Sequence, residues 1–140
     1  MRRGGSKRGA ALLEFALAWP VALLLALGCV ELAVWGEESF AARSAALAGA
    51  RAATAAGSSA QVATFVTMRV LAPSLVGARP TEWCPAEGGA APSVWVCSAD
   101  LGSAVQVEVG GSVPAVVPIG MRQGLPIHAL VVIQKETFAQ

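Results

Sequence analysis

Ionisable side chains are scarce in this sequence, and the scarcity narrows the functions that it can have. Asp, Glu, Lys and Arg make up 14% of the 140 residues, whereas typical soluble domains contain about 25%. The nine acidic residues show no paired spacing suited to general acid–base catalysis, and the single histidine, His128, lies in a strand pattern. A phosphate-binding loop is also missing from the sequence. We therefore expect no enzymatic activity, and the net charge of +1 gives no reason to expect a nucleic-acid partner.

One long apolar run, residues 10–35, stands in contrast to this scarcity. Within the run only Glu14, Cys29 and Glu31 have ionisable side chains. A helix of about 20 apolar residues crosses the hydrocarbon core of a bilayer, so we expect a single transmembrane helix here. Basic residues precede the run, namely Arg2, Arg3, Lys7 and Arg8. By the positive-inside rule the N-terminus stays in the cytoplasm and the C-terminal part is exported.

A cleaved secretory signal peptide is an alternative interpretation of the same stretch. The apolar core of such a signal is about 7–15 residues long, roughly half the length of this run. Glu14 at the beginning of the run also argues against a signal peptide. Small residues within residues 41–50 resemble a cleavage site, so the alternative stays open.

The helical pattern continues beyond the apolar run, because residues 37–56 are mostly alanine, which has the highest helix propensity. No proline or turn cluster intervenes, so the sequence predicts one helix over residues 11–56, about 70 Å long. Pro20 should kink this helix, and Gly49 is its weak interior point. The expected organisation is a basic leader at 1–9, a long helix at 10–56 with a periplasmic part at 36–56, and a small periplasmic domain at 57–140.

A second helix should follow, and it should end before Pro73. Its apolar stripe is expected to consist of Val62, Phe65, Val66, Arg69 and Val70. Residues 71–92 are expected to form a loop. Strands are then predicted at 93–97, 104–109 and 127–138, with Val105, Val107 and Val109 on one face and a turn at Gly110 and Gly111. The fold class is therefore α+β, with a small antiparallel sheet packed on the two helices.

The cysteines divide between the apolar run and the exported part. Cys84 and Cys97 bracket a segment rich in glycine and proline, and exported compartments are oxidising. Closing a loop of about 15 residues stabilises a fold by roughly 3 kcal/mol, so we predict a disulfide between them. Cys29 is expected to pack as a small apolar side chain in a helix interface. Two cysteines and one histidine are too few for a zinc site, so neither a metal nor another cofactor is expected.

Glu14 lies one helical turn after Gly9 and Ala10, and a carboxylate in a membrane helix needs a partner. If a peptidase cut the chain between Gly9 and Ala10, Ala10 would gain a free α-ammonium group. In an assembly of such helices, the Glu14 carboxylate can pair with the α-ammonium group of a neighbouring subunit. Lys7 and Arg8 would hold the cut site on the cytoplasmic side. Snorkelling of Glu14 into the headgroup region is the alternative.

These features resemble those of a known family. Residues 7–15, Lys-Arg-Gly-Ala-Ala-Leu-Leu-Glu-Phe, are similar to the class III signal of type IV prepilins, in which the cut follows a glycine and an acid occupies the fifth mature position. Residues 11–17, 28–32 and 41–53, together with Pro20, resemble TadE-like pseudopilins of the Tad (tight adherence, Flp) pilus system. The likeness extends, more loosely, to the later valine alternation and the closing strand.

The resemblance implies a minor pilin, or pseudopilin, of a type IV pilus that is anchored in the bacterial inner membrane. Its expected partners are that membrane, a prepilin peptidase, other pilins or pseudopilins, and the pilus assembly machinery. Gly9 and Ala10 would form the processing site, Glu14 would guide assembly, and Glu31 would be a second acid of the membrane helix. Two alternatives remain, a pseudopilin of a type II secretion system and a single-pass membrane-anchored periplasmic binding protein.

Overall fold

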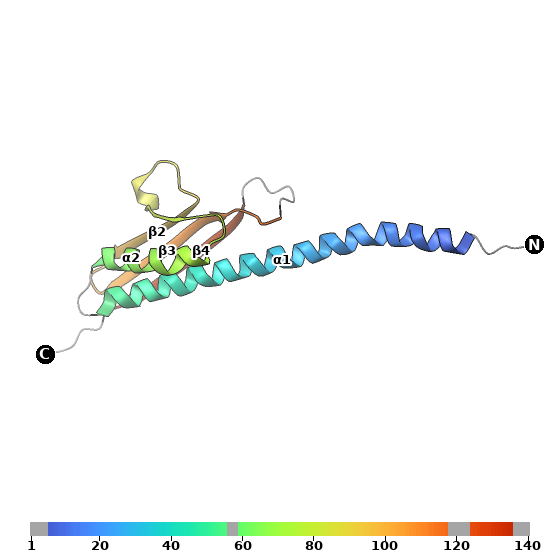
Figure 1. The fold of residues 1–140 in the computed structure, drawn as a ribbon. Helices are drawn as coiled ribbons and strands as arrows, with labels where there is room; N and C mark the ends of the chain where they lie inside the picture. The colour runs from blue at the N-terminus through green and yellow to red at the C-terminus, as the bar shows by residue number, and fades with distance from the viewer. Residues whose placement is uncertain (1–5, 56–58, 118–123, 136–140) are drawn as a thin grey trace, which may run out of the picture.

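The computed structural model describes residues 6–55, 59–117 and 124–135, and shows a long helix with a small α+β unit along its second half (Figure 1). This helix, α1 (Ser6–Thr54), is continuous through Pro20. It begins before the predicted start at residue 11, because only Gly9 among the preceding described residues opposes a helix. The predicted α+β fold with a long apolar N-terminal helix is confirmed.

The second helix, α2 (Ala60–Leu71), packs closely against the last part of α1. A Cβ atom at Gly49 of α1 would overlap the Thr67 hydroxyl oxygen and would lie 2.6 Å from the carbonyl oxygen of Ala63. Only small side chains fit between the two helices at Gly49, whereas the larger Leu71 is buried at the C-terminal end of α2. The predicted apolar stripe of α2 was therefore wrong, and its larger members Val62, Phe65 and Val70 are exposed. The buried face consists of Ala63, Thr64, Thr67 and Leu71.

Four strands form one mixed sheet in the order β1–β2–β3–β4. The strands are β1 (Pro80–Glu82), β2 (Val94–Asp100), β3 (Ala104–Val113) and β4 (Leu125–Gln134). The three longer strands pair antiparallel, as predicted, but β1 pairs parallel with β2. The sequence did not reveal β1, because three residues are too few for a periodic pattern. The predicted loop also contains two short 3-10 helices, η2 (Ala72–Ser74) and η3 (Pro85–Glu87).

The core lies between the inner face of the sheet and the alanine-rich face of α1. Val105, Val107 and Val109 are fully buried on this face, as the alternation in the sequence predicts. Ile127 and Ala129 of β4 are buried beside them. Alanine side chains let α1 lie close to the sheet, and the buried ones are Ala42, Ala45, Ala46, Ala50 and Ala53.

The glycine pair Gly110 and Gly111 lies inside β3 and does not form the predicted turn. A Cβ atom at Gly110 would lie 2.8 Å from Cε2 of the Trp95 indole, which is paired opposite it on β2. A Cβ atom at Gly111, where φ is +132°, would overlap the carbonyl oxygen of Ser93. Glycine is needed here because an indole ring and a neighbouring backbone both approach the strand.

Candidate functional site

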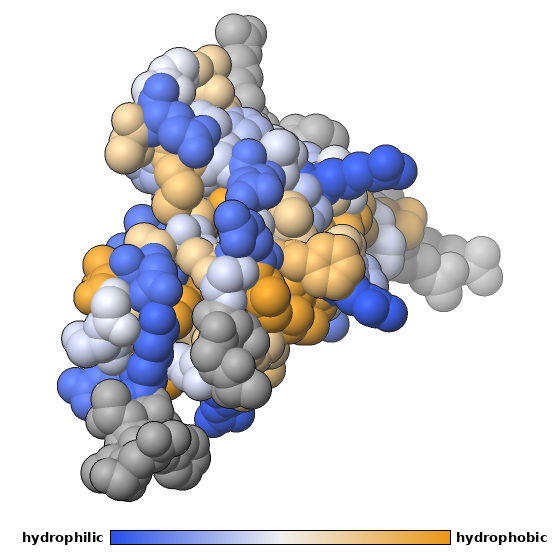
Figure 2. All heavy atoms as spheres, turned by 90° about the vertical axis from the view of Figure 1, so that its left-hand side faces the viewer, coloured by the Kyte–Doolittle hydropathy of each residue, from blue (hydrophilic) through white to orange (hydrophobic). Residues whose placement is uncertain are grey.

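The N-terminal half of α1 extends away from the sheet, and no other described element covers residues 12–26, which we name the bare half (Figure 1). Every residue from 12 to 26 is exposed, and the side chains of Leu12 and Phe15 remain 71% and 65% exposed. Figure 2 views the opposite end of the molecule, where hydrophilic residues (blue) are interspersed with hydrophobic ones (orange). Within the described residues, α1 alone is long and apolar enough to cross a membrane. The structure therefore suggests that the bare half anchors the protein in a membrane.

The expected processing residues lie in the first turns of α1. Gly9 is exposed, and a Cβ atom there would meet no atom within 4 Å. Both Gly9 and Ala10 have helical backbone. Glu14 is exposed one turn later and makes no hydrogen bond or ion pair with the described part of the chain. Its carboxylate is therefore accessible to a group from another molecule.

Glu31, the other acid of the apolar run, has partners within the chain. Its Oε1 accepts a hydrogen bond from the backbone N–H of Val116 at 3.1 Å, and its Oε2 accepts one from Val117 at 2.7 Å. Both residues belong to the segment after β3, residues 114–117, which we name the junction segment; it has neither helical nor strand structure. The Glu31 carboxylate thus fastens the junction segment to α1 and supplies acceptors that a sheet would otherwise provide.

Glu38 repeats this arrangement two helical turns farther along α1. It is only 2% exposed, and its Oε1 accepts a hydrogen bond from the backbone N–H of Val76 at 2.9 Å. Between the two acids, the indole Nε1 of Trp35 donates to the carbonyl of Pro126 at 2.9 Å. No functional role for Glu38 was predicted from the sequence. Its spacing of seven residues from Glu31, on the face that carries the buried alanines, was the available signal.

A groove of about 390 Å³ lies beside Glu31, where the bare half of α1 meets the domain. The lining is apolar apart from Glu31, and its main residues are Leu24, Gly28 and Leu32 on α1 and Ala115, Val117 and Leu125 opposite. Cys29, expected in a helix interface, also lines this groove and is free and exposed. The groove therefore continues the apolar surface of the bare half up to the sheet.

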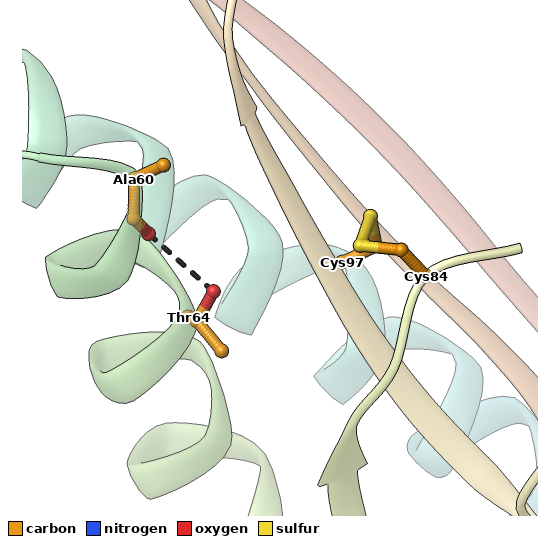
Figure 3. Close-up of a disulfide and its surroundings, with 4 residues drawn as sticks. All are labelled: Ala60, Thr64, Cys84 and Cys97. Atoms are coloured by element: carbon orange, nitrogen blue, oxygen red, sulfur yellow. Dashed lines mark hydrogen bonds between the residues drawn. A yellow bond between two sulfur atoms is a disulfide. The ribbon is translucent and has the colours of Figure 1, made fainter. Parts of the chain in front are cut away.

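Cys84 and Cys97 form the predicted disulfide, with their Cα atoms 4.8 Å apart (Figure 3). The bridge joins the segment after β1 to β2, and the neighbouring Trp83 meets the Trp95 ring edge-on at 5.5 Å. Residues 85–91, which the bridge encloses, are all exposed, so covalent closure rather than burial holds them.

Thr64 of α2, also drawn in Figure 3, is buried and donates its hydroxyl to the carbonyl of Ala60 at 3.4 Å.

Two polar pairs cross the sheet away from α1's bare half. The His128 ring is exposed on the surface of the sheet and pairs with the Glu108 carboxylate at 2.9 Å. Lys135 Nζ lies 2.7 Å from both carboxylate oxygens of Asp100. The hydrogen bond from Lys135, followed by that from the backbone N–H of Gly102, lowers the pKa of Asp100 below its usual value. Both pairs are surface contacts, the first between β3 and β4 and the second between the last residue of β2 and the residue after β4.

Comparison with known families identifies the N-terminal part of the chain. Residues 9–51 match the family model described as TadE-like protein. Over these residues the chain is TadE-like. No curated protein and no solved structure matches the chain. The matched residues include Glu14, Glu31 and Glu38, and extend from the bare half of α1 into its buried half. The match covers most of α1 and none of the sheet.

Proposed function

We propose that this TadE-like protein is a pseudopilin, or minor pilin, of the Tad (Flp) type IV pilus. A prepilin peptidase cuts it between Gly9 and Ala10, and the mature chain then takes part in pilus assembly. The observation that carries the proposal is the exposed Glu14 carboxylate on a bare apolar helix. In hydrocarbon such a charge is costly unless it is paired, and the α-ammonium group of Ala10 in a neighbouring subunit has the required charge.

The proposed location is the bacterial inner membrane, with residues 10–35 spanning it, the N-terminus in the cytoplasm and residues 36–140 in the periplasm. The basic residues before the apolar run support this orientation. The Cys84–Cys97 disulfide supports it independently, because such bonds persist in oxidising compartments. The protein acts as a structural subunit with no enzymatic activity or cofactor of its own.

Sequencing the N-terminus of the membrane-extracted protein tests the proposed processing. In cells with an active prepilin peptidase, the chain should begin at Ala10. Gly9→Leu should block the cut and leave a longer chain that migrates more slowly. Because the space around Gly9 is open, this variant should not disturb the fold. Gly36→Leu is the matched control, since Gly36 is also exposed with no atom near its Cβ position, and it should be processed normally.

The same experiment separates the proposal from its rivals. A chain that begins at Met1 would indicate an uncut membrane-anchored protein, such as a periplasmic binding protein. A chain that begins after the alanine-rich residues 41–50 would indicate a secretory signal peptide. Either result would contradict the pseudopilin proposal. A pseudopilin of a type II secretion system would share the cut at Ala10, and the TadE-like match of residues 9–51 is the observation that favours the Tad pilus.

A further inference from the structure

We propose that the junction segment and the groove beside Glu31 form a second membrane contact, which seats the exported domain directly on the outer leaflet lipids. The inference rests on the proposed membrane anchoring of α1. The surface consists of the exposed Val116 together with the apolar lining contributed by Ala115, Val117 and Leu125. Its partner is the acyl and headgroup boundary of the bilayer that α1 crosses.

The position of the surface along α1 is the first argument. About 20 helical residues cross the hydrocarbon core. Counted from residues 10–12, where the apolar run begins, such a span ends at residues 29–31. The Glu31 carboxylate and the junction segment that it holds lie at this level. Within the described residues, the junction segment is therefore the part of the domain that lies at the level of the lipid surface.

The chemistry of the junction segment is the second argument. Residues 114–117 are Pro-Ala-Val-Val, without a charged side chain, and Val116 is 48% exposed although it is apolar. The groove continues the lipid-facing surface of the bare half without a polar boundary except Glu31. Apolar side chains that enter the headgroup and acyl boundary gain free energy in proportion to their buried area.

The hydrogen bonds of Glu31 are the third argument. An irregular segment that contacts lipid leaves backbone N–H groups without water as a partner, and this is costly. Glu31 accepts from both Val116 and Val117, so these two N–H groups are satisfied by the protein itself. The same bonds satisfy a carboxylate that would otherwise lie unpaired at the end of a membrane helix. Glu31 is thus a positioning residue that presents Val116 to the lipid.

Fluorescence quenching tests this contact in the full chain. In a Cys29→Ser background with the disulfide intact, the environment-sensitive probe NBD is attached through Val116→Cys, and the protein is placed in nanodiscs of phosphatidylethanolamine and phosphatidylglycerol. Brominated lipid should quench this probe, and aqueous iodide should not. Val76→Cys is the matched control, because Val76 is a similarly exposed valine, 52% against 48%, next to the corresponding bond of Glu38. A probe there, about 10 Å farther along α1, should respond only to iodide.

Probes at three positions separate failure of this inference from failure of the anchor. A probe introduced by Leu17→Cys on the bare half should be quenched by brominated lipid. If it is not, the anchor of the proposed function is wrong, and the inference falls with it. If position 17 is quenched by lipid but position 116 responds to iodide, the anchor stands and the lipid contact is refuted. If position 116 is shielded from both quenchers, another protein surface covers it, and the lipid assignment is again overturned.

The positioning role of Glu31 has its own readout. Glu31→Ala should reduce lipid quenching at position 116 and leave quenching at position 17 unchanged, because the junction segment is released while α1 stays in the bilayer. Glu31→Gln keeps one acceptor oxygen and should give an intermediate value. A thermal unfolding scan of each variant identifies any that fails to fold. Unchanged quenching at position 116 in folded Glu31→Ala would contradict the positioning role.

Discussion

The two halves of α1 belong to one helix but differ in the exposure and the size of their side chains. From residue 12 to 26 every residue is exposed, and many are large and apolar, including Leu12, Phe15 and Trp19. From residue 42 to 53 one face is fully buried and is built from alanines and Gly49. The first half has apolar area that no other described residue covers, whereas the second has close partners and little side-chain volume. The first half is therefore suited to contacts with lipid or another subunit, and the second to holding the domain.

The acids of α1 follow the same division. Glu14 in the bare half makes no hydrogen bond or ion pair with the described residues. Glu31 and Glu38, in contrast, each accept hydrogen bonds from backbone N–H groups in loops of the domain. An acid on an apolar helix is therefore informative only together with its surroundings. Partnered acids fasten one part of the chain to another, and an acid without a partner points to an intermolecular role.

The largest expected effect comes from neutralising the acid of the bare half. Glu14→Gln removes the charge that would pair with Ala10 of a neighbour, so pili should be lost or nearly lost when cells are imaged by electron microscopy. The free energy of unfolding should change by less than about 0.5 kcal/mol, because Glu14 is an exposed residue outside the core. Glu37→Gln is the control, since Glu37 is exposed on the same helix beyond the apolar run, and it should leave piliation normal.

Two results with Glu14→Gln would contradict the division of roles between the two halves of α1. Normal piliation in Glu14→Gln would remove the charge-pairing argument. A large loss of stability in the same variant would show that the bare half contributes to the fold. Membrane extraction of the variant should yield as much protein as the wild type, because insertion depends on the apolar run rather than on Glu14.

In the buried half, the expected effect of a substitution is smaller and concerns the stability of the fold rather than piliation. Gly49→Ala places a Cβ atom against the Thr67 hydroxyl and the Ala63 carbonyl oxygen, and overpacking of this kind costs about 1–3 kcal/mol. In an exposed helix position the same change stabilises by up to about 1 kcal/mol. Gly36→Ala is that control, because a Cβ atom at Gly36 meets nothing within 4 Å. Denaturant unfolding of the full chain in detergent should therefore show a lower free energy of unfolding for Gly49→Ala and a higher one for Gly36→Ala. Changes of the same sign would contradict the close α1–α2 packing.

Sequence reasoning succeeded where a single periodicity or spacing controls the structure. The length of α1, the buried face of Val105, Val107 and Val109, and the Cys84–Cys97 bridge all followed from local patterns. It failed where two elements meet. The buried face of α2 could not be predicted from its own residues, because the close approach of α1 at Gly49 selects the small Ala63 and Thr67 for burial there, while Phe65 is exposed.

The candidate site shows the same limit. The sequence identified Glu14 and Glu31 as acids in an apolar run, but it could not distinguish them. The difference depends on Val116 and Val117, which are far from Glu31 in the sequence and reach it because the segment after β3 lies against α1. Gly110 and Gly111 were mistaken for a turn because their need for glycine comes from Trp95 on β2 and from Ser93 just before that strand.

The smallest expected effect concerns charge in the domain, where stability should depend on acid pH through Asp100. Lys135 lowers the pKa of Asp100 in the folded protein, so the pair stabilises the fold above the usual carboxyl pKa of about 4 and ceases to do so as pH falls through the lowered value. Lys135→Met should therefore lower the unfolding midpoint slightly at pH 7, and the difference should vanish in strong acid. Lys135→Arg retains the cation and should keep the wild-type pH profile. A Lys135→Met deficit that persists unchanged at low pH would mean that lost packing of the side-chain stem, rather than the ion pair with Asp100, explains it.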